Sequence, residues 1–125
     1  MRVVSTCIRL RQLEGDIKRL KKRFRSVEDD LVYAERLLEA GRILPQTDPY
    51  RGFGQHNIFK TRVINTDVRR GKSSGYRLIY EEIESGDDKV ILLLLLYDKK
   101  TYDDENKVRI EVKTRLRSPD YPKLT

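Results

Sequence analysis

Hydrophobic residues follow two different periods along the first forty residues of the chain. The segment from Val3 to Leu10 is rich in β-branched side chains, which favours a strand. Apolar positions then recur every three or four residues, as they do on one face of a helix, at Leu10, Leu13, Ile17, Leu20 and Phe24. A second helical stripe follows, at Leu31, Ala34, Leu37 and Leu38. Ser26 with Asp29 is typical of a helix N-cap, and Gly41 is placed to end that helix. The pattern predicts a strand and then a helical hairpin.

Three strand-like runs follow a loop that contains two prolines and two glycines. They are Ile58 to Asn65, Tyr76 to Ile83, and Val90 to Tyr97. The first connection is polar and contains glycine, and the second carries Ser85-Gly86-Asp87, a strong turn signal. Short connections between successive strands predict an antiparallel meander of three strands.

The C-terminal stretch fits two patterns. Val108, Ile110 and Val112 alternate as in a strand, whereas Val108, Val112 and Leu116 keep helical spacing. The acidic residues that precede this run suit the N-terminus of a helix, so we expect a short helix. The predicted order of strand, two helices, three strands and a helix is that of one α+β domain over residues 1–125.

Composition adds a charge bias to this picture. The 125 residues include 27 Lys and Arg against 20 Asp and Glu, for a formal charge of +7. A polyanionic partner is indicated, whether nucleic acid, an anionic membrane surface or an acidic protein. The lone Cys7 excludes an intrachain disulfide and a cysteine-based zinc site, which favours a reducing cytoplasm. No apolar run approaches the about 20 residues of a membrane-spanning helix, and arginines interrupt the N-terminal run where a secretory signal would need apolar residues.

Cations concentrate in one part of the chain. Between residues 60 and 77 there is a single acid, Asp67, among six basic residues: Lys60, Arg62, Arg69, Arg70, Lys72 and Arg77. Lys60 and Arg62 are two apart on a predicted strand, so both leave the same face, where they could bind phosphate or form a solvated surface. The sequence Gly71-Lys72-Ser73 is not the end of a nucleotide-binding P-loop, because Thr66 stands where that motif needs glycine and a strand follows.

Several of these segments together resemble one family of proteins. They are FKTRV at 59–63, RGKSSGYRLIY at 70–80 and LLYDKK at 95–100, preceded by KKRFRSVEDDL at 21–31. The chain, from about Leu10 to Val112, resembles the RelE/ParE superfamily of type II toxins, in particular the RelE- and HigB-like mRNA interferases. The resemblance implies a sheet packed on a helical hairpin. It also implies cleavage of messenger RNA, often on the ribosome, with a cognate antitoxin as partner and no small-molecule cofactor.

The family's reaction needs no metal, because the ribose 2′-hydroxyl attacks the neighbouring phosphate. The resemblance places the family's catalytic arginine on Arg77, whose fork can hold two phosphate oxygens in the transition state. It places the aromatic residue at the end of the last strand on Tyr97, which would contact the scissile nucleotide or move a proton. The remaining cations are expected to bind RNA phosphates: Lys60, Arg62, Arg69, Arg70, Lys72 and Lys99.

The chain departs from some relatives at the acid–base positions. Its one histidine, His56, lies before the second predicted strand, and no Glu occurs among the matched positions. The general base is therefore open, with Tyr97 or a lysine of lowered pKa as candidates. Some superfamily members inhibit DNA gyrase without being enzymes. A ParE-like gyrase inhibitor is therefore the alternative, and a basic adaptor domain is a third.

Overall fold

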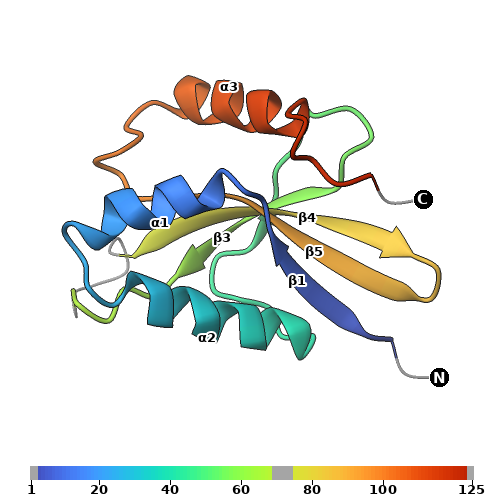
Figure 1. Ribbon diagram of the computed structural model, residues 1–125, viewed down its shortest axis with the longest axis horizontal. Coiled ribbons are helices and arrows are strands. Elements are labelled where there is room, and N and C mark those ends of the chain that lie inside the picture. The colour runs from blue at the N-terminus through green and yellow to red at the C-terminus, as the bar shows by residue number, and fades with distance from the viewer. Residues whose placement is uncertain (1–2, 69–74, 124–125) are drawn as a thin grey trace.

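The structure, a computed structural model, describes residues 3–68 and 75–123. Over these ranges the chain forms an α+β fold of three helices and one five-stranded sheet (Figure 1), which confirms the predicted class. The elements in chain order are β1 (Ser5–Arg9), α1 (Leu13–Lys21), α2 (Val27–Glu39), β2 (Asp48–Pro49), β3 (Ile58–Val63), β4 (Tyr76–Ser85), β5 (Asp88–Tyr97) and α3 (Glu105–Leu116).

The sheet is larger than the predicted meander. Strands β3, β4 and β5 pair antiparallel in succession, as expected. The sheet order is β1-β5-β4-β3-β2, because β1 adds to β5 in parallel and the short β2 pairs with the far edge of β3. The predicted strand count is therefore wrong. A two-residue strand is too short to show alternation, and the parallel pairing of Cys7 with Ile91 spans most of the chain.

Helices cover both faces of the sheet (Figure 1). The α1–α2 hairpin packs on one face over a core that includes Tyr76 and Leu78. Helix α3, the predicted C-terminal helix, packs on the other face over Ile79 and Leu95. Strand β5 lies between the two helical layers, so every residue of its apolar stretch from Ile91 to Tyr97 is buried.

The two sequence signals at the ends of α2 had different outcomes. Gly41 ends the helix as predicted: with φ of +77°, it lets its own N–H and that of Arg42 bond back to the carbonyls of Leu38 and Leu37. Ser26 occupies the N-cap position as predicted, but its side chain caps no backbone N–H. Its hydroxyl donates to the Asp30 carboxylate (2.7 Å), which also accepts from Thr66. The Ser26 hydroxyl is therefore bound to Asp30, which also anchors Thr66 from the distant β3–β4 connection, and it does not cap the helix.

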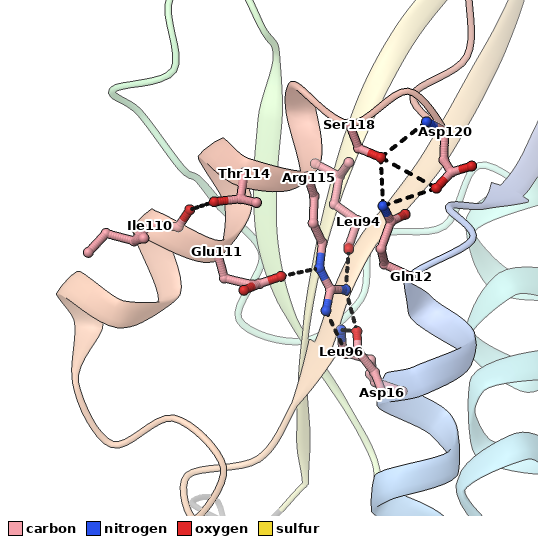
Figure 2. A network of polar contacts seen from close by, with 10 residues as sticks. All are labelled: Gln12, Asp16, Leu94, Leu96, Ile110, Glu111, Thr114, Arg115, Ser118 and Asp120. Carbon is pink, nitrogen blue, oxygen red and sulfur yellow. Dashed lines mark hydrogen bonds and ion pairs between the residues drawn. The ribbon is translucent and has the colours of Figure 1, made fainter.

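A buried ion pair joins α1 to α3 around the edge of β5 (Figure 2). Pairing with β1 ends opposite Leu93, so the next edge groups of β5 have no strand beside them. Asp16 of α1 accepts from the Leu96 N–H (3.0 Å), and Arg115 of α3 donates to the Leu94 carbonyl (2.9 Å). The two side chains also bind each other through two contacts of 2.6 and 2.8 Å. The pair thus satisfies the open edge and holds α3 over its face of the sheet.

Replacing Gly75 with Ala is expected to destabilise the fold. Gly75, just before β4, has φ of +117°, and a Cβ there would lie 2.7 Å from the Val63 carbonyl oxygen and 3.2 Å from Arg62 Nε. Backbone strain of this kind costs about 1–3 kcal/mol, which urea unfolding would measure. Gly15→Ala in α1 is the matched control, because nothing lies within 4 Å of its Cβ position and Ala favours a helix. Equal loss in both variants would contradict this reading of Gly75.

Candidate active site

The register of the meander brings the predicted catalytic residues together. Arg62 of β3 lies opposite Arg77 of β4, and Arg77 lies opposite Tyr97 of β5. Lys60, two residues before Arg62, extends from the same side of β3. We call Lys60, Arg62 and Arg77 the basic row. It lies beside Tyr97 on the face of the sheet that α3 covers.

Lys60 is the centre of a polar network at this end of the sheet. Its ammonium lies 3.2 Å from the Glu105 carboxylate at the start of α3, and it interacts electrostatically with the Tyr97 hydroxyl. It also lies over two aromatic rings, 5.6 Å from the Tyr50 centroid and 5.9 Å from that of Tyr97. The Tyr50 hydroxyl donates to the other Glu105 oxygen (2.5 Å). Two strands, one helix and the loop between β2 and β3 therefore contribute to one group.

The ionisation of this network follows from its contacts. Burial raises the pKa of Tyr97, although Lys60 and Arg77 pull it down. Burial acts to lower the pKa of Lys60, but its contacts with Tyr97 and Glu105 outweigh that effect and the pKa is raised. Burial likewise acts to raise the pKa of Glu105, yet the bonds from Tyr50 and Lys60 hold it below its ordinary value. At neutral pH the group holds a neutral phenol, an ammonium and a carboxylate. Lys60 is thus not the lysine of lowered pKa that the sequence left open as a base.

Arg77 is placed to bind an anion. It is half-buried, and its Nη1 atom is buried without a hydrogen-bond partner among the described residues. A buried donor left unpaired costs about 1–3 kcal/mol, and a second arginine directly opposite, Arg62, adds like-charge repulsion. Both costs are relieved if a negatively charged group binds here.

The other predicted site residues are less closely tied to this group. Lys99 is exposed just after β5, and Arg69, Arg70 and Lys72 lie outside the described residues.

Tyr97 lies deeper than the sequence indicated. Its exposed fraction is 3%, and its ring packs edge-on against Tyr102, with the centroids 5.5 Å apart. In this arrangement no face of the ring is open for a base to stack on, which leaves the hydroxyl as its reactive group.

Sequence reasoning missed several residues around the row. Glu105 and Tyr50 complete the network, and the turn after α1 contributes Arg23, which pairs with the Asp98 carboxylate (2.8 Å) next to Tyr97. A shallow hollow of about 580 Å³ beside them is lined by Arg19, Arg23, Lys100, Thr101 and Tyr102. The sequence places Glu105 at the start of a predicted helix, but it does not show that this helix packs near Lys60 of β3.

His56 lies in a separate cluster. Its Nδ1 lies 2.8 Å from the buried Glu81 carboxylate, whose other oxygen accepts from the Tyr121 hydroxyl (2.8 Å). Glu81 is four residues along β4 from Arg77, roughly 13 Å at the rise of a strand. The cluster ties the segment after α3 to the sheet and does not join the basic row.

No protein-family model matches this chain, and comparison with curated proteins and with solved structures finds no match either. Among residues 3–68 and 75–123, no three His, Cys, Asp or Glu side chains gather where they could hold a metal ion. None of the helices over the same ranges is long and apolar enough to cross a membrane. Inference about function therefore rests on the geometry of the site.

Proposed function

We propose that this protein is the toxin of a type II toxin–antitoxin pair, a RelE-like endoribonuclease that cleaves messenger RNA on the ribosome without a metal. The observation that carries the proposal is the basic row beside Tyr97, within which the Nη1 of Arg77 has no partner in the described part of the chain. Two arginines and a lysine on one sheet face match the needs of a phosphodiester that gains negative charge in its transition state.

The residues divide the reaction between them. Arg77, with Arg62, binds the non-bridging phosphate oxygens and stabilises the charge that develops on them. The 2′-oxygen attacks phosphorus, the bond to the 5′-oxygen breaks, and the products are a 2′,3′-cyclic phosphate and a 5′-hydroxyl. The Tyr97 phenol, neutral and beside the Lys60 ammonium, supplies the proton to the leaving 5′-oxygen.

The partner of such a toxin is an antitoxin that masks the basic row. With a net charge of +7, the chain attracts an acidic surface, and association with one is expected to be fast and salt-sensitive. Co-purification with the product of a neighbouring gene, and loss of RNA access in that complex, would agree with masking.

Induced expression followed by primer extension on cellular transcripts tests the proposal. We expect discrete new 5′ ends with the wild-type protein and none with Arg77→Ala, provided that both accumulate to the same level. Intact transcripts accompanied by DNA damage would contradict the proposal. They would support the alternative, a ParE-like gyrase inhibitor, which the near-complete burial of Tyr97 favours.

A further inference from the structure

Glu105 is the carboxylate that the site contains. Among the described residues, no other Asp or Glu is hydrogen-bonded to Lys60, and none is hydrogen-bonded to Tyr97. Its side chain is 51% exposed, so one side of the carboxylate faces solvent while the other is bound within the network. The Glu105 carboxylate is therefore held in position and is still accessible to a substrate.

Three elements hold the Glu105 carboxylate in place. Tyr50, in the loop between β2 and β3, donates to one oxygen, and Lys60 of β3 binds the other more closely. The backbone beneath it is set by the Asp104 side chain, which accepts from the Asn106 N–H (2.8 Å) and caps α3. Arg109, one turn further along α3, lies 4.4 Å from the centroid of the Tyr50 ring and so supports that contact. The position of the carboxylate follows from tertiary packing and not from a flexible side chain alone.

We infer that Glu105 is the general base of the proposed cleavage, a role that rests on the function proposed above. Its carboxylate takes the proton from the ribose 2′-hydroxyl as the 2′-oxygen bonds to phosphorus. The 5′-oxygen leaves with the proton of the Tyr97 phenol. Lys60 binds the Glu105 carboxylate and lies beside Tyr97, so it can pass the proton from the Glu105 carboxyl to the Tyr97 phenolate and restore the starting state.

The charges around Glu105 favour this assignment. Tyr50, Lys60 and Arg109 lower the pKa of Glu105 and keep it ionised, and the Glu105 charge in turn raises the pKa of Tyr97. A carboxylate of lowered pKa is a weaker base, but it is present in its reactive form throughout the physiological range. The same contacts would serve a purely structural ion pair, so the test needs a readout that depends on proton transfer.

A substrate with sulfur in place of the 5′-bridging oxygen at the cleaved bond provides that readout. Thiolate leaves without a proton, so loss of the general acid matters little on this RNA, whereas loss of the general base matters as before. Glu105→Gln is expected to slow cleavage of both the oxygen and the sulfur substrate by about a hundredfold or more. Tyr97→Phe is expected to cleave the oxygen substrate slowly and the sulfur substrate at close to the wild-type rate.

Glu111→Gln is the matched control. Glu111 lies on the same helix and pairs with Arg115 (2.8 Å), away from the basic row, so near-normal rates are expected. Formate added to Glu105→Ala is expected to restore part of the lost rate, because it supplies a carboxylate in the space vacated; a structural ion pair would not respond in this way.

The outcomes separate the two proposals. If the wild-type protein cleaves RNA and Glu105→Gln retains most of the rate, Glu105 is not the base, although the nuclease stands. Recovery of Glu105→Gln on the sulfur substrate would also overturn the assignment, since it would make Glu105 part of the acid. RNA left intact by the wild-type protein, with ribosomes present, would overturn the proposed function itself.

Discussion

Arg77→Ala is expected to cut the rate of RNA cleavage by about a hundredfold or more. The Nη1 of Arg77 has no hydrogen bond to lose within residues 3–68 and 75–123, so its full contribution appears when the transition-state charge develops. RNA binding should weaken far less, because Lys60 and Arg62 still hold the backbone. Single-turnover cleavage and filter binding on the same RNA would separate the two effects.

The same variant should fold as well as the wild-type protein. The substitution removes a buried donor that has no partner among the described residues, and it removes a cation opposite Arg62; both features are unfavourable for the folded state. Arg77→Met is the matched control, because it keeps most of the apolar stem without the charge, and it should be as slow as Arg77→Ala. An Arg77→Ala protein that unfolds would show that Arg77 is structural.

A substrate with deoxyribose at the cleaved position should bind normally and remain uncut by the wild-type protein, because the nucleophile is missing. Cleavage of that substrate at a normal rate would refute the proposed chemistry.

Arg115→Met is expected to destabilise the protein by about 3–5 kcal/mol, because it leaves the Asp16 carboxylate buried without its partner. It also removes the donor to the Leu94 carbonyl at the edge of β5. Urea unfolding at neutral pH would measure the loss. The double variant Asp16→Asn with Arg115→Met should be more stable than Arg115→Met alone, since the amide oxygen can still accept from Leu96 and carries no charge.

The pH dependence of these variants gives an independent check. Burial raises the pKa of Asp16, and Arg115 opposes that rise in the wild-type protein. Without Arg115, the pKa of Asp16 in the folded state lies above its value in the unfolded state. Between these two pKa values, Asp16 is protonated in the folded state and ionised in the unfolded state. The free energy of unfolding of Arg115→Met should therefore fall as the pH rises above the ordinary pKa of a carboxyl group. The loss of stability relative to the wild-type protein should then be smaller at pH 5 than at pH 8. The double variant should lack this dependence, and an equal deficit at both pH values for Arg115→Met would argue against a buried charge.

Local patterns in the sequence were sufficient for most of the secondary structure. The helical stripes of α1 and α2, the stop at Gly41 and the three strands of the meander depend on side chains close together in the chain, and such signals are read directly. The placement of Lys60 and Arg62 on one face was predicted from alternation along their strand, whereas their alignment with Arg77 and Tyr97 depends on the register of β3, β4 and β5.

Contacts between distant segments were decided by packing alone. The parallel addition of β1 to β5, the Asp16–Arg115 pair and the approach of Glu105 to Lys60 each join residues separated by 45 positions or more. Nothing in the local spacing of these residues specifies the partner, because α3 could have packed along either face or at another angle. Burial of Ile79 and Leu95 beneath α3 sets that angle, and it thereby brings a carboxylate to the basic row and covers Tyr97.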